Sequence, residues 1–293
     1  VLFALLFLLF LTFIYALNSG SYHLPFDRIF TILYQSVTNP GLLESTPSEK
    51  LVVIDFRLPR VLLAILTGIS LAIAGCVMQA LLRNPLVSPF TLGLSSAASF
   101  GAAMAIVFGG SIMPFIPPEF QNGVIILCAF LLGWLSILLI YGISRMKGSS
   151  SATLILAGVV IGYIFTAGVM ILKYLTNDEK LREITLWLMG GMWGANWGAI
   201  IIVAPITLLC FLYLESKAWD LTTLSAGDDV AKNLGVNVNR LRLTGLFVAT
   251  LAASACLAFT GIIGFIGLMG PHIGRMLIGN DNRYLIPCSA LLG

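Results

Sequence analysis

The sequence predicts an all-α integral membrane protein, a polytopic helical bundle, and three observations support this fold class. Hydrophobic residues make up 58% of the 293-residue chain and charged residues only 10%, with a mean hydropathy of +0.99. Soluble domains are about 45–50% apolar and about 25% charged. The charges lie between long uncharged runs. No alternating pattern typical of barrel strands occurs, so helices must satisfy the backbone in lipid.

The uncharged runs place the helices in order, because a bilayer core of about 30 Å needs roughly 20 helical residues. The first run is an expected span rather than a signal peptide, since it has no basic leader and no Ala-x-Ala site. Asn84 and Pro85 close the second helix and Pro89 opens the third, because proline blocks helix continuation. The expected helices cover residues 1–17, 61–82, 90–108, 121–143, 152–173, 197–214, 242–260 and 263–278, with a ninth beginning at Leu285.

We expect a single transmembrane domain over residues 1–293 that is truncated at both ends and lacks its last helix. The chain starts at Val1 rather than at methionine, and Gly293 lies part-way through an apolar segment. A cytoplasmic N-terminus places the small excess of loop Lys and Arg inside. Five cysteines stand singly in apolar runs and are expected to pack there: Cys76, Cys128, Cys210, Cys256 and Cys288.

Two uncharged runs are unlike plain spans. Residues 184–214 would extend about 46 Å as one helix. Their segment WLMGGMWGANWG predicts either an interfacial turn with aromatic anchors before a tightly packed helix, or a short broken helix that lines a cavity. In TGIIGFIGLMGPHIGR, residues 260–275, a glycine every three residues followed by Pro271 indicates close backbone packing and a helix break.

The polar residues restrict the function. No expected span carries an Asp, Glu, Lys or Arg near its middle, which argues against an ion-gradient-driven secondary transporter. The only histidines are His23 and His272, and neither a His-Glu-x-x-His nor a Gly-x-Ser-x-Gly motif occurs, so we expect no enzyme and no bound metal. A channel filter is not found either. No Gly-Lys dipeptide of a P-loop is present, so the energy for uphill transport would come from another subunit.

A polar island, SAGDDVAKNLGV at residues 225–236, stands out in this apolar chain. It predicts a helix over about 226–234 that is capped by Ser225 and ended by Gly235. Val230 and Leu234 share one face, while Asp228 and Lys232 form an acid-to-base pair four residues apart. This helix is either a solvated surface helix between two spans or a docking surface for a soluble partner.

The segment RLPR raises a similar question before the second helix. Arg57 and Arg60 lie three residues apart at the mouth of a span. They are either interfacial anchors or hooks for carboxylates, because a guanidinium group binds a carboxylate through two hydrogen bonds.

Several segments together resemble the FecCD-type permeases, the membrane subunits of bacterial ABC importers for iron siderophores, haem and cobalamin. The resemblance covers essentially the whole chain in order. It rests on RLPRVLLAILTGISLAIAGCVMQALLRNPLVSPFTLG (57–93), LILAGVVIG (154–162), WLMGG (187–191), AGDDVAKNLGV (226–236) and GIIGFIGLMGPHIGR (261–275).

The resemblance implies a ten-helix permease, with about nine spans present here, that pairs with a second copy or a paralogue. It also implies two ATPase subunits that use ATP and magnesium, an extracytoplasmic substrate-binding protein, and a multi-pass position in the cytoplasmic membrane of a bacterium or archaeon. The implied function is import of a ferric siderophore or similar metal chelate. Cobalamin or haem import, or secondary transport, are the alternatives.

Site residues follow from the same resemblance. Arg57 and Arg60 would pair with glutamates of the binding protein. Ser150 and Ser151 would form the cytoplasmic gate, although Ala152 stands where a relative has a second hydroxyl. The polar island would be the coupling helix that enters the ATPase, through Leu224, Asp228, Val230, Ala231, Leu234 and Gly235.

Overall fold

The computed structural model describes residues 1–20, 22–38, 47–112, 120–146 and 150–293, and every regular element in these ranges is a helix. The all-α prediction is confirmed. The α-helices are α1 Leu2–Asn18, α2 Phe26–Thr38, α3 Pro47–Lys50, α4 Leu58–Leu82, α5 Leu94–Ile112, α6 Gln121–Met146, α7 Ser151–Leu175, α8 Asp178–Met189, α9 Trp197–Ser216, α10 Ala218–Ser225, α11 Asp228–Asn233, α12 Val238–Thr260, α13 Ile266–Ile278 and α14 Asn282–Leu292. A π-helix, η1 Leu51–Arg57, and a 3₁₀ turn, η3 Met192–Gly194, join them.

The helices differ in length more than the uncharged runs indicated. Among the described residues, five helices are long and apolar enough to cross a membrane: Ser48–Leu82, Gln121–Met146, Ser151–Leu175, Trp197–Ser216 and Val238–Thr260. The expected span at 263–278 is the 13-residue α13, which is only about 20 Å long and cannot cross a bilayer core as a single helix.

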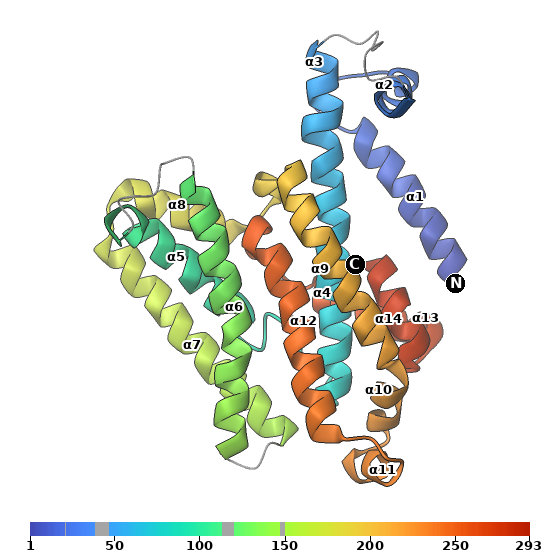
Figure 1. The fold of residues 1–293 in the computed structure, drawn as a ribbon, viewed down its shortest axis with the longest axis vertical. Coiled ribbons are helices and arrows are strands. Elements are labelled where there is room, and N and C mark those ends of the chain that lie inside the picture. Colours follow the sequence, from blue (N-terminus) through green and yellow to red (C-terminus); the bar gives the residue numbers. More distant parts are fainter. Residues whose placement is uncertain (21, 39–46, 113–119, 147–149) are drawn as a thin grey trace.

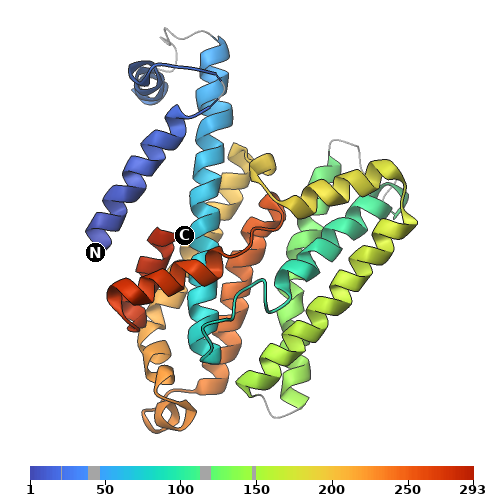
Figure 2. The same ribbon diagram turned by 180° about the vertical axis from the view of Figure 1, so that it is seen from behind.

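A continuous helix through α3, η1 and α4 is the central column of the bundle. It covers 35 residues, Ser48–Leu82, and at about 52 Å it is longer than a bilayer core. Helices α5 to α8 gather on one side of it, whereas α1, α13 and α14 lie on the other, as Figures 1 and 2 show from opposite directions. Helix α12 packs against α4 and α6 and so joins the two sides.

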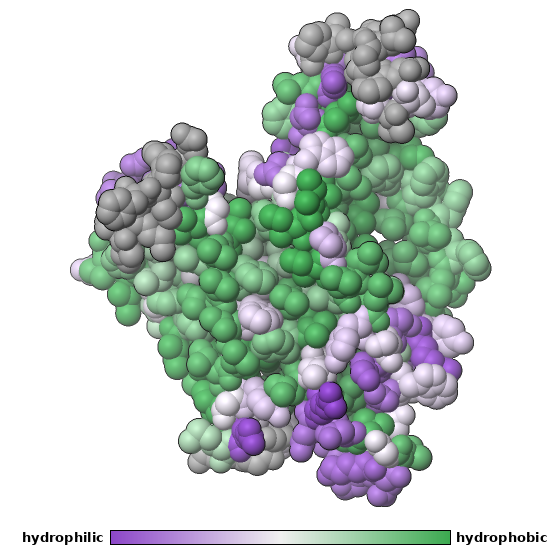
Figure 3. All heavy atoms as spheres, viewed as in Figure 1, coloured by the Kyte–Doolittle hydropathy of each residue, from purple (hydrophilic) through white to green (hydrophobic). Residues whose placement is uncertain are grey.

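The surface divides into an apolar middle and more polar ends. In Figure 3 hydrophobic side chains cover the middle of this face, and hydrophilic ones gather at the end that holds α10 and α11. This end also contains the last turn of α4 and the first turns of α7 and α12. Hydrophilic residues therefore gather where several helix ends meet.

The prolines of the RNPLVSP segment stand before α5 rather than in it. Asn84 and Pro85 lie in the turn after α4, where the Asn84 side chain accepts a hydrogen bond from the Leu86 N–H at 2.9 Å. Helix α5 begins at Leu94, so Pro89 does not open it. The intervening turn is stabilised by the Ser88 N–H, which donates to the Thr91 hydroxyl at 2.8 Å.

The WLMGGMWG segment forms a turn before a helix, the first of the two structures that the sequence predicted for it. Helix α8 ends at Met189, the 3₁₀ turn η3 follows, and α9 begins at Trp197. This turn packs against the end of α12, where the Gly191 N–H donates to the Thr260 carbonyl at 2.7 Å. The backbone after Thr260 is also non-helical until α13 begins, so the predicted break in the glycine-rich segment is present.

The break does not lie at Pro271, and that prediction is wrong. Pro271 sits inside α13, where it cannot supply the N–H that would bond the Gly267 carbonyl one turn earlier. The Gln79 side chain of α4 supplies it instead, donating to that carbonyl at 3.2 Å. Arg275 in turn donates to the Gln79 side-chain oxygen. A neighbouring helix therefore satisfies the backbone, and α13 continues through the proline.

Candidate functional site

The predicted helix of the polar island is present as α11, which covers Asp228–Asn233 and is therefore shorter than the expected 226–234. Helix α10 ends at Ser225 and α11 begins at Asp228, with Gly227 at φ +124° between them. Only glycine adopts this backbone conformation readily, so the chain turns at Gly227. The Ser225 hydroxyl donates to the Leu221 carbonyl at 3.2 Å, and the prediction that it caps the helix is wrong. Gly235 follows α11 with φ +86°.

The structure divides the predicted contact residues between the core and the surface. Val230 is 44% exposed and Leu234 68% exposed, so both offer apolar surface at the polar end of the molecule. Leu224 and Ala231 are fully buried in the main core, where they hold the two helices in place rather than meet a partner.

Asp228 is paired with arginines from two other helices. The Arg242 guanidinium of α12 contacts both carboxylate oxygens, each at 2.8 Å, and Arg83 at the end of α4 lies 3.5 Å away. The predicted pair of Asp228 with Lys232 is wrong, since Lys232 lies 3.4 Å from Asp229. Sequence reasoning missed both arginines. The signals were their positions: Arg83 directly precedes the Asn-Pro turn, and Arg242 lies shortly after the island and just before an uncharged run.

The two predicted gate residues have different roles at the start of α7. Ser150 is its N-cap and accepts a hydrogen bond from the Thr153 N–H at 3.1 Å. Ser151, the first helical residue, accepts one from Arg242 at 3.1 Å. Ala152 follows them and is exposed. The same guanidinium therefore contacts α7 and α11.

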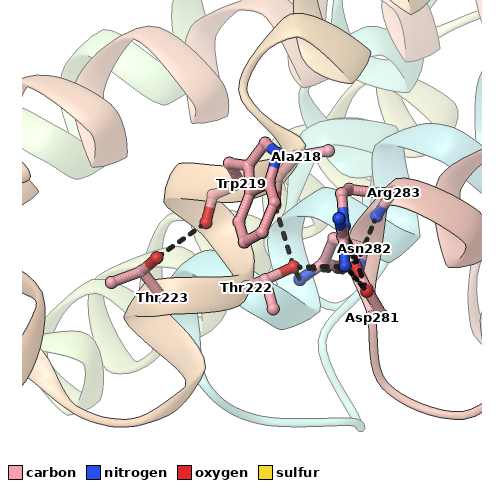
Figure 4. Close-up of polar contacts among 7 residues, drawn as sticks. All are labelled: Ala218, Trp219, Thr222, Thr223, Asp281, Asn282 and Arg283. Atoms are coloured by element: carbon pink, nitrogen blue, oxygen red, sulfur yellow. Dashed lines mark hydrogen bonds and ion pairs between the residues drawn. The ribbon is translucent and has the colours of Figure 1, made fainter.

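A second polar cluster fixes α10 against the start of α14, and Figure 4 shows it in close-up. Arg283 lies 3.9 Å from the centre of the Trp219 ring, and its Nε is 3.0 Å from each Asp281 carboxylate oxygen. The Thr222 hydroxyl accepts a hydrogen bond from the Asn282 N–H at 3.0 Å. The bond from Arg283 lowers the pKa of Asp281. This cluster makes α10 a firm base for α11.

At the opposite end, Arg57 and Arg60 are in different environments. Arg57 is buried, and its guanidinium donates to the Leu17 carbonyl at 3.0 Å and to the Tyr22 carbonyl. Arg60 is exposed and borders an apolar groove of about 320 Å³ between α1 and α4. Of the two predicted docking residues, the structure leaves Arg60 open to solvent and uses Arg57 to fasten the end of α1.

A cavity of about 540 Å³ lies beside the turn that follows α8. Its lining includes Glu183, Trp187, Trp193 and Asn196, so aromatic surface and a carboxyl group face one space. Burial raises the pKa of Glu183, and the nearby Glu179 raises it further. The turn that follows α8 therefore borders this cavity through Trp193 and Gly194.

Comparisons with known proteins agree with this architecture. The model of the FecCD transport family matches residues 8–293. The molybdate import permease of Haemophilus influenzae is 35% identical over all of this chain and 84% of its own length. The hemin transport permease of Yersinia pestis is 38% identical over 98% of this chain and 82% of its own.

A solved structure extends the likeness to three dimensions. It is an inward-facing conformation of a metal-chelate type ABC transporter, 33% identical in sequence, and it superposes with a TM-score of 0.83 over 99% of this chain and 85% of that one. Members of the family are permease subunits rather than enzymes. With its helical membrane bundle and its match along nearly the whole sequence, this chain belongs to the FecCD transport family of ABC importer permeases.

Proposed function

We propose that this chain carries a ferric siderophore or similar metal chelate across the cytoplasmic membrane of a bacterium or archaeon. It pairs with a second permease subunit, receives substrate from an extracytoplasmic binding protein and is driven by two ATPase subunits that use ATP and magnesium. The observation that carries the proposal is α11, a short anchored helix that exposes Val230 and, at its C-cap, Leu234.

The ATPase contact is assigned to α11 because exposed apolar side chains on a rigid base suit a docking surface. A Val or Leu side chain contributes about 1.5–3 kcal/mol when fully buried. The buried Leu224 and Ala231 support the helix from below, and Gly235 ends it. On the other face of the membrane, exposed Arg60 is the better partner for a carboxylate of the binding protein. Arg57 contributes indirectly, by holding the end of α1 in position.

The test of this function is co-purification of the ATPase, co-expressed with the full-length permease in mild detergent. We compare wild type, Leu234→Asp, Val230→Asp and a variant with residues 226–234 replaced by a Gly/Ser linker. Met146→Asp is the matched control, because Met146 is an exposed apolar residue at the C-terminal end of α6, outside α11. We expect at least about a tenfold loss of bound ATPase for Leu234→Asp, the effect of about 1.4 kcal/mol.

Equal retention by the linker variant would remove α11 from the interface. A wild-type protein that binds no ATPase and takes up substrate along an ion gradient would favour the secondary transporter. Substrate choice is tested separately, by ATP-dependent uptake into proteoliposomes of radiolabelled ferric hydroxamate, ferric citrate, haemin, cobalamin and molybdate. The metal-chelate transporter structure supports this substrate class, and transport of haemin, cobalamin or molybdate alone would contradict the choice of a ferric siderophore.

A further inference from the structure

Arg242 is a buried cation whose contacts come from three other helices. Only 4% of the residue is exposed, in the first turns of α12. A buried guanidinium is tolerated only when its donors are used. All three guanidinium nitrogens make contacts here: two hold the Asp228 carboxylate of α11, Nε donates to the Leu81 carbonyl of α4 at 3.2 Å, and Nη2 also donates to the Ser151 hydroxyl of α7.

These contacts join two parts of the chain that transport must couple, the proposed ATPase contact and the predicted gate. Helix α11 is the ATPase contact in the proposed function, and Ser151 begins the helix that carries the predicted gate. Arg242 bridges them directly, since its Nη2 lies 2.8 Å from Asp228 and 3.1 Å from Ser151. The Leu81 carbonyl holds the same side chain against the central column. A guanidinium is rigid and planar, so a displacement of the carboxylate moves all of its hydrogen bonds together.

We propose that Arg242 is a positioning residue that transmits movement of α11 to the start of α7, and so links the ATPase to the gate. The inference rests on the proposed function. A lysine at this position keeps the charge but lacks the planar guanidinium group, so it cannot hold Asp228 through two bonds while donating to Leu81 and Ser151. The link is a coupling between sites, and such couplings typically change an equilibrium about 5- to 150-fold.

The experiment measures the gate directly and needs no identified substrate. A polar maleimide labels Ala152→Cys in the complete complex, with and without ATP and vanadate, and the background labelling of the same complex without the Ala152→Cys substitution is subtracted. Wild-type Arg242 is compared with Arg242→Lys and Arg242→Met. Arg240→Met is the control, because Arg240 is an exposed arginine two residues earlier on the same helix.

We expect ATP to change the labelling rate at least about fivefold in the parent, which is the Ala152→Cys chain with Arg242 intact, and in Arg240→Met. In the Arg242 variants the rate should hardly change, although their ATPase subunits remain bound and still hydrolyse ATP. Ser151→Ala removes only the contact to α7, and it carries the test if both arginine variants fail to fold. Ser151→Ala and Arg242→Lys should cause losses that do not add, because both break one link.

Two outcomes overturn the inference while the proposed function stands: an ATP-dependent change that survives in Arg242→Lys and Ser151→Ala, or a parent chain whose labelling ignores ATP although the ATPase is bound. A parent chain that retains no ATPase overturns the proposed function itself, and the inference with it.

Discussion

Replacing Arg57 with methionine should free the end of α1 without disturbing the rest of the bundle. The guanidinium donates to the Leu17 carbonyl at 3.0 Å and to the Tyr22 carbonyl, and the residue is only 9% exposed. Hydrogen bonds from charged donors contribute about 1.5–3 kcal/mol each, so losing two costs at least about 3 kcal/mol. Since 1.4 kcal/mol is a factor of ten, local opening of α1 should become about 100-fold more frequent.

Hydrogen exchange of α1 peptides in detergent measures this opening residue by residue. Arg60→Met is the control, because exposed Arg60 makes no hydrogen bond to α1 among those found in the described residues. Protection in the control should stay at the wild-type level. If Arg57→Met loses less than about fivefold protection, equivalent to about 1 kcal/mol, while binding-protein affinity collapses, then the reasoning is refuted and Arg57 contacts the binding protein directly.

Three further predictions follow from the packing of the helices. Gln79→Leu should lower the free energy of unfolding by about 1–3 kcal/mol because it leaves the Gly267 carbonyl without a hydrogen bond. Adding Pro271→Ala restores an N–H within α13 and should recover part of the lost thermal stability. No recovery would contradict the role of Gln79 as the donor to this carbonyl. Gly93→Ala should destabilise the protein by at least about 1 kcal/mol, because Gly93 has φ +77° and an added Cβ would lie 2.6 Å from a backbone carbonyl of α7. An unchanged yield and melting temperature would contradict this prediction. The pKa of Asp281 is lowered in the folded protein, so its ion pair stabilises the fold above the ordinary carboxyl value of 3.8, and this stabilisation is lost as the pH falls through the lowered folded value. The difference in melting temperature between wild type and Asp281→Asn should therefore be constant near neutral pH and disappear only below about pH 3.8. A difference that disappears above about pH 5 would show a different cause.

Much of the membrane architecture was predictable because lipid imposes a simple rule on the chain. A run of about 20 uncharged residues must be helical, and the expected helices at 121–143 and 152–173 match α6 and α7 closely. The polar island was predictable as an interruption of that rule. Its apolar pair, Val230 and Leu234, was identified from spacing alone, and both residues are exposed.

Where a side chain finds its partner was not predictable, because charged groups pair across helix ends that are distant in sequence. Asp228 lies four residues from Lys232, which local spacing favours, yet its partner is Arg242 in another helix. Burial decides this: the core cannot hold Arg242 unpaired, whereas Lys232 is solvated.

Composition and the spacing of charges were enough to predict the class of the protein, the order of its long helices and the place of its polar island, because these depend on the solvent that each segment meets. The side-chain partners depend on how the helices pack. This packing turned Arg57 inward to the carbonyls of α1, let Pro271 remain inside a helix through Gln79, and brought three helix ends around one guanidinium. Each is a hydrogen bond between segments far apart in the chain, and such bonds exist only after the helices have packed.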